Sequence, residues 1–143
     1  ELDEIFEMRI LLEPSCAAAA VSRLSDEEAV RLVKLLTAMD EADPQEPVAA
    51  MGARRAFYQE LYSMSGRPRM AETIIQLRDH VSRFHVLRSD DGCIHAHQAL
   101  RDCIENRDGS AASRVVRDHL VDAHNDQVPE SIRLRYTFSE TRE

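Results

Sequence analysis

The sequence predicts an all-α fold, an antiparallel bundle of about six helices that encloses a polar central cavity. Apolar residues recur at steps of three and four along most of the chain, the spacing of one face of an α-helix. Glycine and proline number only 4 and 5 among 143 residues, and so few breaks favour long helices over many short strands. No segment shows the pattern of a convincing strand, and the length fits one domain.

The first two helices have the clearest patterns. The first is expected over residues 2–23, and Pro14 within it removes a backbone donor, so we expect a kink or a division into two helices. The second begins after Ser25, because Ser25 and Glu28 have the spacing of a capping box. Its expected buried stripe consists of Ala29, Leu32, Val33, Leu36 and Met39.

The remaining elements follow from breaks and apolar stripes. In order, they are a loop over 40–47, a helix over 48–63 that stops at Gly66, a helix from Pro68 to about Phe84, a turn over 89–92, a helix over 94–106 and a helix over 111–127. Residues 1–130 then form the domain, and the charged residues 131–143 form a C-terminal tail.

The composition restricts the class of protein. Lys plus Arg is 18 and Asp plus Glu is 26, and a net charge of -8 argues against DNA or RNA binding by this segment alone. We find no membrane-spanning run and no signal peptide. The chain begins at Glu1 rather than Met, so we expect part of a longer protein. The three cysteines form no CxxC pair and suit a reduced cytosolic protein, with Cys16 and Cys103 buried.

Four polar side chains fall where the helical period demands apolar residues. They are Arg9, Arg54, His97 and His119, on four different expected helices. Burying such groups is costly unless each finds a partner. We interpret them as the lining of one polar cavity, to which Tyr58 adds a hydroxyl group.

Simpler interpretations of the same residues remain open. Arg9 has Glu13 one turn away as an ion-pair partner, Arg54 has a stem long enough to carry its charge outward, and either histidine suits a hydrogen-bonded core position. The other histidines lie off the main stripes, and we expect them at the surface or at an interface: His80, His85, His95 and His124.

Motifs of catalysis are missing from the sequence. It has no Gly-rich phosphate loop, no H-E-x-x-H and no G-x-S-x-G. No serine or cysteine has a local arrangement with a base that would mark a nucleophile. We therefore expect that the chain is not an enzyme.

Several short motifs, in order along nearly the whole chain, resemble one known family. They are Glu7-Met8-Arg9 with Leu12-Glu13-Pro14, Arg55-Ala56-Phe57-Tyr58 with Ser65-Gly66-Arg67-Pro68, His97-Gln98-Ala99-Leu100 with Asn106-Arg107-Asp108, and Arg117-Asp118-His119-Leu120. Together they resemble the FadR C-terminal domain of bacterial GntR-type transcription regulators. Each motif is weak alone, and the ordered set carries the resemblance.

The resemblance implies a cytoplasmic, homodimeric effector-binding domain. A winged-helix domain preceding Glu1 would bind operator DNA, and the effector would change the spacing of the two DNA-reading heads. Apolar residues outside the main stripes of the first and fourth helices fit a dimer surface: Phe6, Met8, Leu11 and Ile75.

The resemblance also bears on metal binding. In many members, one Asp and three His bind a divalent metal within the bundle. His97 and His119 match the last two positions, but Arg54 stands where the Asp is expected and Tyr58 where the first His is expected. Two imidazoles rarely make a secure site, and an arginine beside them repels a dication. Zn, Ni or Mn at His97 and His119 is therefore disfavoured, and we predict no cofactor.

The same departure favours a metal-independent pocket for a small organic acid or similar anion. Arg54 would bind a carboxylate in bidentate fashion, and Arg9, Tyr58, His97 and His119 would complete the polar lining. Two alternatives remain open. One is a structural or interaction bundle without a ligand, and the other is a helical metal-binding protein or enzyme that uses His97 and His119.

Overall fold

The computed structural model describes residues 2–82 and 93–126, with residues 93–96 described by backbone alone. Six helices make up most of these two stretches: α1 Leu2–Val21, α2 Asp26–Glu41, α3 Pro47–Ser63, α4 Pro68–Ser82, α5 Cys93–Asn106 and α6 Gly109–Asn125. No strand occurs within them. The prediction of an all-α bundle of about six helices is confirmed.

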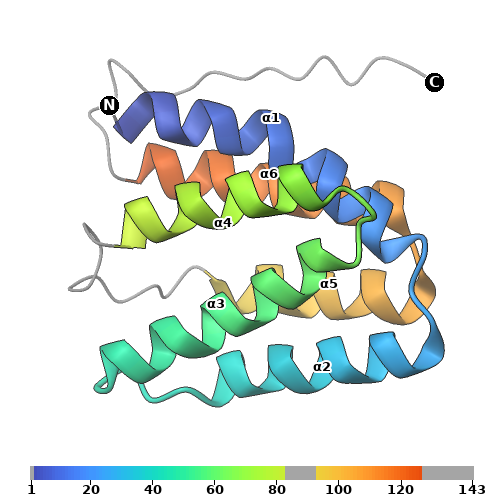
Figure 1. The fold of residues 1–143 in the computed structure, drawn as a ribbon. Helices are drawn as coiled ribbons and strands as arrows, with labels where there is room; N and C mark the ends of the chain where they lie inside the picture. Colours follow the sequence, from blue (N-terminus) through green and yellow to red (C-terminus); the bar gives the residue numbers. More distant parts are fainter. Residues whose placement is uncertain (1, 83–92, 127–143) are drawn as a thin grey trace.

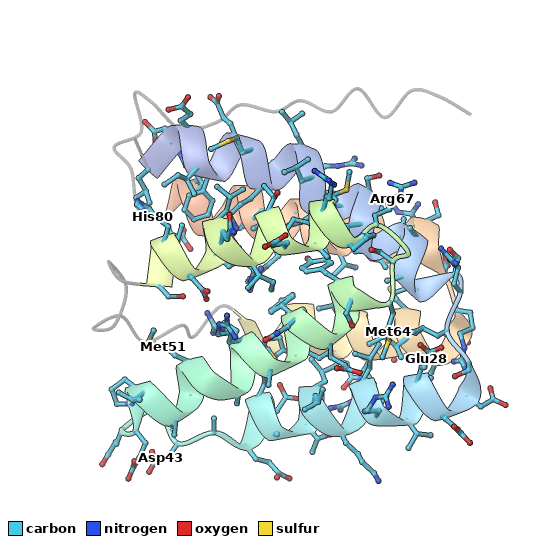
Figure 2. All side chains as sticks on the ribbon, viewed as in Figure 1. Glu28, Asp43, Met51, Met64, Arg67 and His80 are labelled. Atoms are coloured by element: carbon cyan, nitrogen blue, oxygen red, sulfur yellow. The ribbon has the colours of Figure 1, made fainter. Side chains whose placement is uncertain are left out.

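The helices form two layers, and successive helices run in opposite directions (Figure 1). One layer is built on α1, which packs against α4 and α6. The other is built on α2, which packs against α3 and α5. Contacts of α1 with α3, of α3 with α4 and of α5 with α6 join the layers. Arg67 and His80 mark the two ends of α4, which lies along α1 (Figure 2).

Most helix ends lie close to the predicted positions. Ser25 caps α2: its Oγ accepts from the Glu28 N–H at 3.1 Å, and Glu28 Oε1 accepts from the Ser25 N–H at 3.0 Å, so the capping box is confirmed. The loop before α3 is shorter than predicted, because α2 continues to Glu41 and α3 begins at Pro47. Two residues earlier than predicted, α6 begins at Gly109, because the Asp108 side chain accepts the Ala111 N–H.

Of the two outcomes expected at Pro14, a kink or a division, the division does not occur, because α1 continues through that residue. The kink stays a prediction. Proline removes only one helical hydrogen bond, and Pro14 is buried. The burial of Pro14 in the bundle therefore offsets the local cost.

The core is continuous across both layers. Its largest fully buried side chains are Tyr62, Phe6, Phe57, Leu32, Leu36, Leu61, Ile74, Leu100, Ile104, Leu120, His124 and Glu13. Cys16 and Cys103 are buried, as predicted, and burial raises the pKa of both thiols. No helix in the described part of the chain has the length and apolar character needed to cross a membrane.

Two residues expected near the surface lie in the core instead. His124 is 1% exposed, its Nε2 lies 2.7 Å from Asp3 Oδ1, and its ring meets the Phe6 ring edge-on at 5.4 Å. Phe6 is also 1% exposed and is therefore not available to a partner. The reason is tertiary: α1 and α6 pack antiparallel, which places the start of one helix beside the end of the other.

Some predicted features lie outside the described residues. These are Phe84, His85, the turn over 89–92, the side chain of His95 and the tail over 131–143.

Arg107 connects two turns at one end of the bundle. It is the one non-glycine residue with a positive φ in the described chain, at 55°. Its Nη1 donates to Ile104 O at 2.6 Å, its Nε to Leu24 O at 3.2 Å and its Nη2 to Asp26 Oδ1 at 2.8 Å. The guanidinium thus joins the end of α5 to the turn between α1 and α2, and these hydrogen bonds offset the backbone strain.

The close contact of α6 with α1 predicts a size limit at Gly109. A Cβ there would lie 2.5 Å from Ala18 O, so Gly109→Ala is expected to lower the free energy of unfolding by about 1–3 kcal/mol. Gly52, inside α3, is the matched control because a Cβ there meets nothing within 4 Å, and Gly52→Ala should stabilise by about 0.5–1 kcal/mol. Urea unfolding measures the free energy of unfolding of both variants. Equal changes in the two variants would contradict the close contact between Gly109 and Ala18.

Candidate functional site

A fully buried carboxylate lies where α1, α3 and α4 meet. Glu13 of α1 accepts three hydrogen bonds: from Arg9 Nε at 2.6 Å, from Tyr62 Oη at 2.7 Å and from Arg78 Nη1 at 2.6 Å. The Arg9 and Arg78 side chains are nearly buried as well. We name these four residues, together with Tyr58, the Glu13 cluster.

Helical spacing assembles the Glu13 cluster from three elements. Arg9 and Glu13 are four residues apart on α1, so both side chains lie on the face that packs against α3 and α4. Tyr58 and Tyr62 are likewise four apart on α3, and both are buried. Arg78 comes from α4, which packs on both of these helices.

Aromatic rings hold the arginines in place. Arg78 Cζ lies 3.5 Å from the centroid of the Tyr58 ring, and Tyr58 is stacked on Tyr62 with centroids 5.9 Å apart. Arg9 Cζ lies 5.1 Å from the centroid of the Phe6 ring. A guanidinium over an aromatic face gains cation–π energy and keeps a defined plane. The orientation of Arg78 is therefore set by Tyr58 on one face and by Glu13 at Nη1.

The electrostatics of the cluster keep Glu13 ionised. Burial alone would raise the pKa of the Glu13 carboxyl, but the charges of Arg9 and Arg78 and the Tyr62 hydrogen bond outweigh it and lower the pKa. Burial lowers the pKa of Arg9. At Arg78 burial is the largest influence and acts in the same direction, but the charge and hydrogen bond of Glu13 together with Tyr58 and Tyr62 outweigh it and raise the pKa. Burial, together with the Glu13 charge, raises the pKa of Tyr62 well above its usual range. Both arginines stay protonated at neutral pH in any case.

The cluster carries an excess of positive charge. Two guanidinium groups share one carboxylate, and Tyr62 is neutral. Within the described chain, Arg9 Nη1 and Nη2 and Arg78 Nε and Nη2 have no hydrogen-bond partner. A nearly buried, incompletely balanced charge is costly, and a bound anion would reduce that cost.

A second polar cluster connects α2 to α5. His97 Nδ1 lies 2.6 Å from Asp40 Oδ1, and Arg101 Nη2 donates to Asp40 Oδ2 at 3.1 Å and to Thr37 Oγ1 at 3.2 Å. Arg101 Nε is buried without a hydrogen-bond partner among the described residues. This arrangement makes His97 a hydrogen-bonded core histidine, one of the interpretations that the sequence left open.

The predicted site residues fall in different parts of the bundle. Arg9 and Tyr58 belong to the Glu13 cluster, whereas His97 is buried against Asp40. The ion pair of Arg9 with its neighbour one turn away is confirmed. Arg54 and His119 are half-buried, and each has an interaction partner. A single cavity lined by all five predicted residues remains a prediction.

Sequence reasoning missed three members of the Glu13 cluster as site residues. Glu13 entered only as a partner for Arg9, and Tyr62 lies one turn beyond Tyr58 on the same face. Arg78 had the clearest signal, because it lies four residues after Ile74 on the inward stripe of α4. The rule that singled out Arg9 and Arg54 would also have found it.

Metal ligands do not gather in the described chain: no group of three or more His, Cys, Asp or Glu side chains there is arranged to hold an ion. His97 has Asp40 beside it, but most protein metal sites use further ligands.

A hollow of about 450 Å³ between α2 and α3 is shallow and open, and the Arg31–Glu60 ion pair, with a 2.8 Å Nε–Oε1 distance, lies in its lining. The buried charges of the Glu13 cluster make it the stronger candidate site.

The helical bundle and the family to which it belongs define the class of protein. The sequence pattern of the FCD domain matches residues 4–122. The chain belongs to this family, the FadR C-terminal domain of GntR-family regulators, and the predicted resemblance is confirmed. FCD domains belong to regulatory proteins rather than enzymes, and the family indicates the effector-binding domain of a transcription regulator. No curated protein and no solved structure matches the chain.

The Tyr62 hydrogen bond predicts a pH-dependent loss of stability. Tyr62→Phe removes one donor to a buried charge and should lower the free energy of unfolding by about 1.5–3 kcal/mol at neutral pH. The pKa of Glu13 is lower in the folded protein than its usual 4.5, so the stabilisation from its charge is present at neutral pH and is lost as pH falls through the folded value. The difference between the two proteins should therefore shrink in acid.

Urea unfolding at a series of pH values measures this difference. Ser63→Ala is the control, because its hydroxyl bonds only to Glu60 O at the surface and its removal should change stability by less than about 0.5 kcal/mol. A Tyr62→Phe effect that is equally large at all pH values would show that Glu13 is not the charged acceptor.

Proposed function

We propose that this chain is the ligand-sensing and dimerisation domain of a bacterial, cytoplasmic, DNA-binding transcription regulator, and that it binds a small organic acid or similar anion. The observation that carries the proposal is the Glu13 cluster, in which two nearly buried guanidinium groups share one carboxylate. Arg9, Arg54, Tyr58, His97 and His119 are the proposed lining of the site. Family membership supports the effector-binding role.

The proposed site works without a metal. The net positive charge of the Glu13 cluster would repel a dication and attract an anion. Arg54 and Tyr58 also replace the carboxylate and imidazole that metal-binding relatives are expected to have at these positions. Elemental analysis of protein purified without chelator tests this, and stoichiometric Zn, Ni or Mn that depends on His97 and His119 would overturn it.

The proposed response to the effector runs through α1. This helix supplies Arg9 and Glu13 to the cluster, and its first turn is held to α6 by Asp3 and His124. In the intact regulator, a winged-helix domain that reads operator DNA would precede this helix. An anion that binds one placement of α1 more tightly than another shifts the population toward it and thereby changes operator binding.

A panel of organic acids is the first test of the function. An acid that binds only the folded state at about 100 times its Kd stabilises it by about 2.7 kcal/mol, which appears as a higher melting temperature. We expect at least one acid to raise the melting temperature in this way. Arg54→Ala should weaken the binding of that acid by several kcal/mol if the charge pair is desolvated. No stabilisation by any acid would favour a bundle whose polar groups only satisfy one another, and unchanged affinity in Arg54→Ala would remove this residue from the site.

The outer face of α1 is the proposed dimer surface. Met8 and Leu11 are 37% and 74% exposed, and Ile75 on the adjacent α4 is half-buried. Exposed apolar side chains that lie together favour a partner surface over open solvent. We expect Leu11→Asp to convert a dimer into a monomer in sedimentation at micromolar concentration.

Val48→Asp is the matched control for this change. Val48 is 79% exposed, but it lies at the start of α3, away from α1. This variant should sediment as the unchanged protein does. A wild-type protein that is only monomeric, or equal behaviour of both variants, would contradict the dimer surface.

A further inference from the structure

We propose that Arg78 is the residue that anchors the ligand, that the group it binds is a carboxylate, and that Glu13 and Tyr58 position its guanidinium for this contact. The inference rests on the proposed function and names the charged anchor of that site. Three observations support it: the unused donors of Arg78, its fixed orientation and the charge balance around it.

The first observation concerns donors. Arg78 uses Nη1 for Glu13, and its Nε and Nη2 have no hydrogen-bond partner in the described chain. These two nitrogens form one edge of the guanidinium, with N–H bonds nearly parallel. The two oxygens of a carboxylate match such an edge and accept both hydrogens at once. A planar carboxylate is therefore the group that fits.

The second observation concerns orientation. The Tyr58 ring lies 3.5 Å from Arg78 Cζ, and the Glu13 contact at 2.6 Å fixes the guanidinium within its own plane. A long arginine side chain normally loses rotamer freedom when it binds a ligand, which weakens binding. Here Tyr58 and Glu13 have already restricted it, so the unused edge is preorganised.

The third observation concerns charge. Glu13 is shared between Arg9 and Arg78, so it balances only one of them. The adjacent carboxylate is engaged elsewhere: Asp79, the next residue on α4, forms a two-point ion pair with Arg55. A carboxylate from outside would complete the balance in the described part of the bundle.

Arg55 provides a natural comparison. It lies on α3, its Nε and Nη2 bond both oxygens of Asp79 at 2.9 and 3.1 Å, and the pair is exposed to solvent. The edge that is unused in Arg78 is therefore already occupied in Arg55. Arg55→Lys is the matched control for Arg78→Lys, because both variants keep the charge and lose the flat two-point edge.

The experiment uses sodium acetate as the probe and the full 143-residue chain, labelled with ¹⁵N. The Nε–Hε signal of Arg78, assigned through bonds in a sample labelled with ¹³C and ¹⁵N, is followed by NMR at constant ionic strength. We expect a saturable shift with acetate and none with acetamide, which has nearly the same shape and no charge. Two results overturn the carboxylate assignment. One is an Arg78 signal that does not shift with acetate, and the other is a Kd for sulfate as low as the Kd for acetate.

The variants supply the second readout. Arg78→Lys should raise the Kd of acetate by about tenfold or more, whereas Arg55→Lys should leave it within about twofold. Lysine keeps a positive charge beside Glu13, and thermal unfolding checks that the variant is folded. An unchanged Kd in folded Arg78→Lys contradicts the proposal, and the wild-type titration decides the matter if that variant does not fold.

The outcomes separate this inference from the function on which it rests. If an organic acid stabilises the protein while the Arg78 signal and the Arg78→Lys variant show no effect, the sensing function stands and Arg78 is not its anchor. If neither acetate nor any acid of the panel binds, both proposals are wrong.

Discussion

The burial of the Glu13 carboxylate is the constraint on which the rest of this structure depends. An ionised carboxylate without water is very costly unless hydrogen bonds and opposite charges surround it. The three donors come from three helices: Arg9 of α1, Tyr62 of α3 and Arg78 of α4. Their short contacts limit how these helices can shift or rotate against one another. The same constraint leaves one guanidinium without a full counter-charge, so the group that organises the packing also supports the proposed binding of an anion.

Polar contacts elsewhere organise the remaining helices in a similar way. Asp40 joins α2 to α5 through His97 and Arg101, and Arg107 joins the end of α5 to the turn before α2. His124 and Asp3 join α6 to the start of α1. Apolar burial drives the bundle together. These directional contacts select one arrangement among the many that similar apolar stripes would permit.

The predictability of each feature follows from the range of the interaction behind it. The helices and the Ser25 cap depend on residues within a few positions, and the sequence predicted them well. The sequence left open a kink or a division of α1 at Pro14, because the cost of a proline is local whereas its compensation comes from packing. His124 was placed wrongly, since its burial requires α1 to pack antiparallel on α6.

By itself, the sequence determined that this protein is an all-helical FCD domain with charged residues on inward faces, because periodicity and ordered motifs are properties of the chain. Tertiary structure decided which of those residues meet. It paired Arg9 with Glu13, added Arg78 and Tyr62, and placed His97 beside Asp40 on the other layer. The physical reason is that a charge is stabilised by groups within a few ångströms in space, and here most of those groups lie between 49 and 65 residues away in sequence.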